Sequence, residues 1–203
     1  MKLYDGGRVP NARRVRIFLA EKGVSIPLVP VDLGRGEHKS ADFTAINPLQ
    51  RVPALALDDG TVICESLAIC RYVEALHPEP PLFGTDPLSI ARIEMWERRI
   101  EHGLLAQIAA IFRHTHPAMA ELEVPQVPAW GEANRPKVEA SLAFLDRHLA
   151  QSPFLAGDAF SVADISALVG LDFLRLARMR VPEELAALTA YHERLKARPS
   201  AAA

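Results

Sequence analysis

The sequence predicts a small mixed α/β domain followed by an all-helical domain. Short strand-like and helix-like runs alternate in residues 1–77, whereas residues 88–198 show helical periodicity throughout. The segment 77–87 between them contains four prolines and one glycine, which disfavour both helix and sheet. We therefore predict a first domain over 1–80, a linker over 81–87 and a helical domain over 88–203.

Composition excludes several classes of protein. Of the 203 residues 49% are hydrophobic and 24% are charged, which is typical of a soluble globular chain and excludes disorder. The formal net charge of −2 lacks the basic excess of a nucleic-acid binder. No apolar run is long enough to span a membrane, and the first residues lack a secretory signal. Two cysteines are too few for a disulfide framework, so we expect a cytoplasmic protein with no nucleic-acid or membrane partner.

The first domain begins with a strand around Leu3-Tyr4. Pro10 is suited to the first position of the helix that follows, with Asn11 as an alternative cap, and Gly23 ends this helix. The run Ile26–Val31 has strand character, but its two prolines remove hydrogen-bond donors and predict a sheet edge.

A short helix over 41–46 and a β-hairpin complete the first domain's sheet. The apolar runs 54–57 and 61–64 flank Asp58-Asp59-Gly60, and Asp-Gly between such runs indicates a hairpin. Ser66 is suited to cap the next helix. The predicted core face of this helix consists of Leu67, Ile69, Tyr72, Val73 and Leu76.

The sequence predicts a helical bundle for the second domain. Apolar residues at spacings of three and four predict a long helix over 88–112 and another over 135–150. Further helices are expected after Ser161 and over 182–197, with a loop or broken helix over 115–131.

No pattern in the sequence predicts a metal site. Only His114-Thr115-His116 brings histidines close together, and neither an HExxH nor a CxxC motif occurs. Cys64 and Cys70 are expected to be buried, unreactive thiols. The local basic cluster is interpreted as a solvated helix face, with an anion site as the alternative. It consists of Arg8, Arg13, Arg14 and Arg16.

A block in the middle of the chain carries a family resemblance. It runs Asn47-Pro48-Leu49-Gln50-Arg51-Val52-Pro53-Ala54-Leu55, then Asp58-Asp59-Gly60, then Glu65-Ser66-Leu67-Ala68-Ile69. Supporting fragments are 10–17, 21–23, 31–33, 36–39 and 160–165. In this order and spacing they resemble the cytosolic glutathione transferase superfamily over nearly the whole chain, in its bacterial, theta- or nu-like form. The resemblance implies a thioredoxin-like domain before the helical one, glutathione as co-substrate, no metal, and a cytoplasmic homodimer.

The Val52-Pro53 bond is expected to be cis, as the corresponding bond is in the family. A cis X-Pro bond is usually a deliberate turn device. It leaves the N–H and C=O of Val52 available to pair with an extended peptide, such as the cysteinyl segment of glutathione. The alternative is an ordinary proline that opens a strand.

Two further groups are candidates for the ends of glutathione. Glu65-Ser66 stands at a helix start, where a hydroxyl and free N–H groups suit the γ-glutamyl carboxylate and Glu65 suits the ammonium group. The alternative for Ser66 is capping alone. His38, Lys39 and Arg51 are candidates for the glycyl carboxylate, with surface charge as the alternative.

The candidate donors for the glutathione thiolate are Tyr4, Asn11 and the nearby arginines, with Asn11 favoured over Tyr4 because Pro10 holds it at the start of a helix. Val9 falls about where serine-type members have their hydroxyl, so the usual serine and cysteine are missing. Tyr4 matches the tyrosine classes in rough position, and Asn11 matches some nu-like members. An Asn11 amide at a helix start has the helix dipole behind it.

Ser161 and Asp164 match the capping box that the family has in its helical domain. The S-x-x-D spacing lets each side chain bond to the other residue's backbone N–H. We therefore assign this pair a structural role.

The leading hypothesis is a glutathione transferase that attacks a small apolar electrophile or a disulfide. The alternatives are a non-catalytic glutathione-binding or protein-interaction module, and a glutathione-dependent isomerase or dehalogenase. Four residues are candidates for the electrophile pocket, with core packing as the alternative. They are Met95, Trp96, Phe112 and Trp130.

Overall fold

The computed structural model describes residues 1–203 and divides into two compact units. Unit 1 comprises 1–82 together with 199–203, and unit 2 comprises 83–198. The sequence predicts the last five residues in the helical domain, but they lie with unit 1. The Ala201 carbonyl accepts a hydrogen bond from Arg13 (3.0 Å), and the Ser200 hydroxyl donates to Glu21.

Unit 1 contains a four-stranded mixed sheet. The strands are β1 (Lys2–Asp5), β2 (Leu28–Pro30), β3 (Ala54–Ala56) and β4 (Val62–Cys64). Their order in the sheet is β2-β1-β3-β4, with β2 parallel to β1 and β3 antiparallel to both β1 and β4. β2 is shorter than the expected 26–31 but lies at the sheet edge, as its prolines predict.

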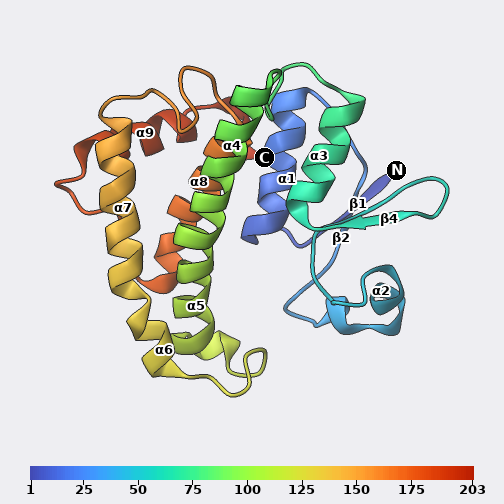
Figure 1. Cartoon of the computed structure of the whole chain (residues 1–203). Coiled ribbons are helices and arrows are strands. Elements are labelled where there is room, and N and C mark those ends of the chain that lie inside the picture. The colour runs from blue at the N-terminus through green and yellow to red at the C-terminus, as the bar shows by residue number, and fades with distance from the viewer. The chain divides into compact units, whose positions relative to one another are not determined.

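Helices α1 (Pro10–Lys22) and α3 (Ser66–Leu76) pack against each other in unit 1, as Figure 1 shows. Pro10 is the first residue of α1, and Val9 rather than Asn11 is its N-cap residue. Gly23 ends α1 with a φ of 64°, a left-handed conformation that glycine adopts readily.

The buried face of α3 differs from the predicted one. Leu67, Tyr72 and Leu76 are half-buried or exposed, whereas Ile69 and Val73 are buried as predicted. The other buried positions are Ser66 and Cys70. The spacing 66, 69, 70, 73 is a regular helical stripe, and hydropathy missed it because one of its members is polar. The remaining helix of unit 1 is α2 (Ala41–Ile46), where it was expected.

The proline-rich segment after α3 is held against α1 at its start. The Lys22 ammonium group is fully buried and donates to the carbonyl groups of Pro78 (3.2 Å) and Pro80. It also forms an ion pair with Glu74 of α3. These contacts satisfy a buried charge, as its burial requires.

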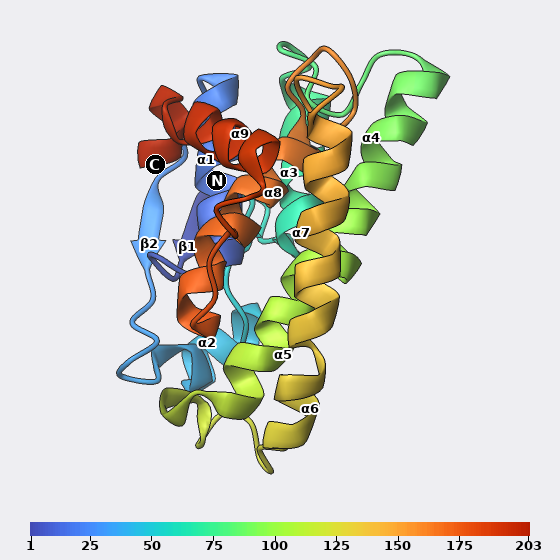
Figure 2. The ribbon, with the colours of Figure 1, turned by 90° about the vertical axis from the view of Figure 1, so that its left-hand side faces the viewer.

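Unit 2 is helical, and none of its helices is long and apolar enough to cross a membrane. α4 (Pro87–Ile100) and α5 (Ala106–Thr115) continue one another through a π-helical turn (Glu101–Leu105), and α7 (Arg135–Leu149) runs beside them in Figure 2. The apolar side chains that predicted the long helix are all buried: Ile93, Trp96, Ile100, Leu104, Ile108 and Ile111. The helices are α4 (Pro87–Ile100), α5 (Ala106–Thr115), α6 (Pro128–Ala133), α7 (Arg135–Leu149), α8 (Val162–Phe173) and α9 (Ala186–Lys196). The last helix begins four residues after the predicted start, because Pro182 lies in a turn before it.

Asp164 is the central polar group of unit 2. Ser161 and Asp164 form the expected capping box at the start of α8, where the carboxylate accepts both the N–H and the hydroxyl of Ser161, each at 2.9 Å. It also accepts the Leu155 N–H (2.9 Å) and the Tyr191 hydroxyl (2.7 Å). Burial raises the pKa of the Asp164 carboxyl, and these hydrogen bonds oppose the shift. Asp164 therefore joins α8, α9 and the loop before α8.

Replacing Asp164 tests this structural role. Asp164→Ala leaves three buried donor residues without an acceptor, so we expect unfolding to be easier by about 3 kcal/mol or more. Thermal melting and urea denaturation measure the loss. The exposed Asp158 of the same loop is the control, and Asp158→Ala should change stability by less than about 0.5 kcal/mol. Lost activity in an Asp164→Ala protein of unchanged stability would contradict the assignment.

Candidate functional site

Three chain segments meet at one end of the sheet in unit 1. Ala54, the first residue of β3, lies opposite Tyr4 of β1 and Cys64 of β4. Because both pairings are antiparallel, the carboxyl ends of β1 and β4 meet the amino end of β3. The β1–α1 loop, Val52-Pro53 and Glu65-Ser66 are therefore neighbours, although they are far apart in the sequence.

Gly6 allows the β1–α1 loop to approach the segment before β3. A Cβ atom at this position would lie 2.5 Å from Cγ2 of Val52, closer than real contacts permit. The loop is also fixed by Asp5 and Arg16. The carboxylate of Asp5 accepts the Gly7 N–H (2.9 Å) and a hydrogen bond from Arg16 (2.5 Å), which also donates to the Gly7 carbonyl (2.8 Å). Hydrogen bonds to both the N–H and the C=O of Gly7 thus fix the loop that leads into α1.

The Val52-Pro53 peptide bond is cis, as predicted. Val52 precedes β3, and neither its N–H nor its C=O makes a hydrogen bond within the chain. An unpaired N–H and C=O next to a strand are the groups with which an extended peptide pairs.

Ser66 is not a helix cap. Glu65 occupies the N-cap position of α3 with φ 67° and ψ 119°, an uncommon conformation for a residue with a side chain. Such strained residues cluster at functional sites. Ser66 is 4% exposed, and its side-chain oxygen accepts a hydrogen bond from Arg14 (2.7 Å) instead of one from the helix backbone.

Arg14 lies at the candidate site. The sequence favours a solvated face for its cluster, with an anion site as the alternative, but Arg14 is 1% exposed. The available signal was its spacing from Phe18, since residues four apart lie on one helix face and Phe18 is buried. Its Nη1 also lies 3.4 Å from Oδ1 of Asn11, so one guanidinium group contacts both Ser66 and Asn11.

The two thiolate candidates lie in different surroundings. Asn11 is the second residue of α1, is exposed, and contacts the Arg14 guanidinium. Tyr4 is in the sheet, where its half-buried ring makes an edge contact with Phe43 of α2 at 5.9 Å between centroids. The structure therefore links Asn11 with Ser66 through Arg14, and it gives Tyr4 a packing contact.

A second cluster contains the three basic candidates. His38 lies in a short 3-10 turn (Glu37–Lys39) and is 5% exposed, whereas Lys39 and Arg51 are exposed. Burial, together with the positive charges of Lys39 and Arg51, lowers the pKa of the His38 imidazole. Its Nδ1 atom is buried and has no hydrogen-bond partner within the chain. A buried polar atom of this kind marks a position for a ligand or an ordered water.

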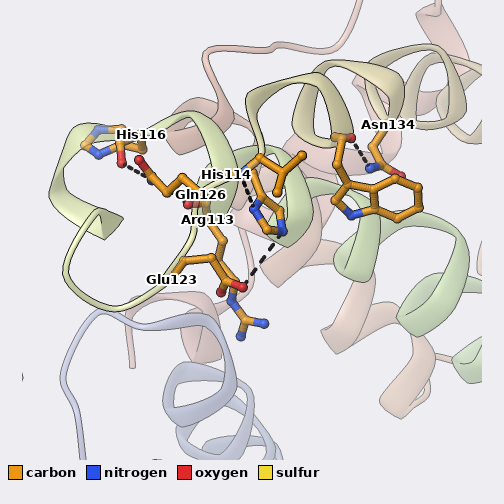
Figure 3. A network of polar contacts seen from close by, with 8 residues as sticks. Arg113, His114, His116, Glu123, Gln126 and Asn134 are labelled. Carbon is orange, nitrogen blue, oxygen red and sulfur yellow. Dashed lines mark hydrogen bonds and ion pairs between the residues drawn. The ribbon is translucent and has the colours of Figure 1, made fainter.

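The neighbouring histidines in unit 2 are engaged with the loop after α5 (Figure 3). Nδ1 of His114 accepts the Val127 N–H (3.1 Å), and its Nε2 lies 3.8 Å from Glu123. Gln126 donates to the carbonyl group of His116 (3.0 Å). These contacts fix the loop, and no group of three or more His, Cys, Asp or Glu side chains is arranged to hold a metal ion.

The two cysteines are free thiols. Cys70 is buried as expected, whereas Cys64 at the end of β4 is only half-buried. Burial and the Glu65 carboxylate raise the pKa of the Cys64 thiol, which disfavours its reactive thiolate form.

Of the candidate pocket residues in unit 2, Trp96 belongs to the core. It is 4% exposed, and its ring centroid lies 4.2 Å from that of His148. Phe112 is half-buried, while Met95 and Trp130 are exposed.

Comparisons with known proteins agree with this fold. A model of the glutathione S-transferase N-terminal domain matches residues 1–75, and a model of the C-terminal domain matches 128–194. Glutathione S-transferase 2 of Saccharomyces cerevisiae is 41% identical over 203 residues, covering 98% of this chain and 87% of that protein. Maleylacetoacetate isomerase of Pseudomonas aeruginosa is 40% identical over 120 residues, covering 58% of this chain and 53% of that protein.

A solved structure matches both units. The crystal structure of a glutathione S-transferase domain-containing protein from Marinobacter aquaeolei has a TM-score of 0.94 and 43% identity, covering 98% of this chain and 99% of that chain. The thioredoxin-like domain and the helical domain expected from the sequence are both present in this comparison. With both domains matched and a relative 41% identical over nearly its whole length, the chain belongs to the glutathione S-transferase family.

Proposed function

We propose that this glutathione S-transferase activates glutathione at the end of the sheet in unit 1 and transfers it to an apolar electrophile or a disulfide. One observation carries the proposal. The register of the sheet gathers Val52 and Ser66 beside the start of α1, where Arg14 contacts both Ser66 and Asn11. The free N–H and C=O of Val52, the buried hydroxyl of Ser66 and the exposed amide of Asn11 thus lie together.

In this proposal each part of glutathione has its own partner. The N–H and C=O of Val52, just before the amino end of β3, pair with the extended cysteinyl segment. The γ-glutamyl carboxylate binds the Ser66 hydroxyl and the N–H groups at the start of α3, and Glu65 takes the ammonium group. The glycyl carboxylate binds the basic cluster of His38, Lys39 and Arg51. The unpartnered Nδ1 of His38 supports this last assignment.

Attack on an electrophile or a disulfide requires glutathione as a thiolate, and a free thiol has a pKa of about 8.5. A hydrogen-bond donor at the sulfur lowers this value. We assign that donor to the amide of Asn11 rather than to Tyr4, because Asn11 shares Arg14 with Ser66 whereas Tyr4 packs on Phe43. The thiolate then forms a bond to an electrophilic carbon and the leaving group departs with its electron pair, or it displaces a thiolate from a disulfide.

The proposal includes a homodimer in the cytoplasm, as is usual for the family. The cytoplasm keeps thiols reduced, which suits glutathione chemistry and the two free cysteines of this chain. A second candidate is a glutathione-dependent isomerase, favoured by the 40% identity to maleylacetoacetate isomerase over 120 residues.

A substrate panel tests the function. It contains a chloroaromatic compound, a hydroperoxide, a mixed disulfide and maleylacetoacetate, each assayed with and without glutathione. Glutathione-dependent turnover of one of the first three supports the transferase, and turnover of maleylacetoacetate alone supports the isomerase. Glutathione binding with no turnover at all supports the non-catalytic module.

Replacing Ser66 tests the glutamyl site. Ser66→Ala removes a hydrogen bond to a charged carboxylate, worth about 1.5–3 kcal/mol, so calorimetric titration should show glutathione affinity reduced about tenfold or more. Ser89→Ala is the control, because it also removes a serine hydroxyl near a helix start, in the capping box of α4 in unit 2. It should leave the glutathione affinity unchanged. An unchanged dissociation constant in a folded Ser66→Ala protein would refute the assignment.

Two substitutions test the thiolate donor. Asn11→Ala should raise the pKa of bound glutathione and reduce turnover about ten- to a hundredfold, or about 1.4–2.7 kcal/mol. Tyr4→Phe should leave both values nearly unchanged. Ultraviolet titration of the bound thiolate measures the pKa. A thiolate signal lost in Tyr4→Phe and kept in Asn11→Ala reverses the assignment.

A further inference from the structure

The buried guanidinium group of Arg14 contacts two polar side chains, Ser66 and Asn11. A guanidinium group has only N–H donors and no acceptor. The Ser66 oxygen, 2.7 Å from Nη1, must therefore accept, and the hydroxyl hydrogen of Ser66 is left to donate elsewhere. Since Ser66 is 4% exposed and Arg14 is 1% exposed, this geometry is fixed by packing.

The same reasoning applies to Asn11. Its Oδ1 is the atom that lies 3.4 Å from Nη1 of Arg14, because a donor faces an acceptor. With Oδ1 turned toward Arg14, the Nδ2 donor is directed to the opposite side of the amide. Asn11 is exposed, so this donor is accessible to a ligand.

We propose that Arg14 is a positioning residue that orients the Ser66 hydroxyl and the Asn11 amide together, so that both present their donors to a ligand with two anionic groups. The inference rests on the proposed function, in which these groups are the γ-glutamyl carboxylate and the thiolate. In addition, the Arg14 side chain alone controls both the affinity for glutathione and the pKa of the glutathione thiol.

Arg14→Lys tests orientation separately from charge. Lysine keeps the positive charge but lacks the planar fork that reaches two acceptors in fixed directions. We expect glutathione to bind about fivefold more weakly or worse, and the pKa of its bound thiol to rise by about half a unit or more. Arg13→Lys is the matched control, because Arg13 contacts Ala201 instead and should leave both values unchanged. Thermal melting of each variant confirms folding.

Double mutants show whether Arg14 acts through its two neighbours. In Arg14→Lys with Ser66→Ala, binding should be no weaker than in Ser66→Ala alone. In Arg14→Lys with Asn11→Ala, the thiol pKa should equal that of Asn11→Ala alone. Additive effects in both pairs would overturn the inference, and so would unchanged affinity and thiol pKa in a folded Arg14→Lys protein.

The measurements also separate this inference from the proposed function. Wild-type protein that binds no glutathione refutes the proposed function and the inference with it. Wild-type protein that binds glutathione, with Arg14→Lys equal to Arg13→Lys in affinity and thiol pKa, refutes only the role of Arg14. If Arg14→Lys lowers only the melting temperature, its role is structural and the inference is wrong.

Discussion

Ala54 pairs with Tyr4 on one side and with Cys64 on the other, and this register determines which residues meet at the site. Side chains alternate between the faces of a strand, so a slip of one residue would turn Ala54 and Leu55, which are both buried, toward the opposite faces of the sheet. It would also separate Val52 from Gly6, whose missing side chain permits their close approach. Short strands of three or four residues therefore fix the positions of the β1–α1 loop, Val52-Pro53 and Glu65-Ser66.

Each unit contains a buried charged side chain that forms hydrogen bonds with more than one other residue. In unit 1 the guanidinium group of Arg14 contacts Ser66 and Asn11, and in unit 2 the carboxylate of Asp164 accepts from Ser161, Leu155 and Tyr191. Burying a charge is unfavourable unless its partners replace water. Such groups therefore specify one arrangement of their neighbours. At Asp164 that arrangement supports the fold, whereas at Arg14 it lies beside residues proposed to bind the ligand.

Helical periodicity predicted the elements well where the buried face is apolar. The long helix of unit 2 and the helix after Pro10 were found because leucine, isoleucine, valine and aromatic residues repeat at helical spacing. The same method misjudged α3, since Ser66 faces inward while Leu76 is 49% exposed. Hydropathy does not register that a buried partner such as Arg14 makes an inward serine favourable.

The sequence by itself determined the two-part organisation, the family, and the motifs around Val52-Pro53, Glu65-Ser66 and Ser161-Asp164. The family follows from the order and spacing of motifs along nearly the whole chain, whereas local signals suffice for the motifs and the boundary, because proline, glycine and capping residues act on their nearest neighbours. Only the tertiary structure decided that Arg14 is buried, that Ser66 accepts its hydrogen bond, and that Asn11 rather than Tyr4 shares this contact. Ser66 lies 52 positions from Arg14 along the chain, and only the folding of α3 against α1 brings the two side chains into contact.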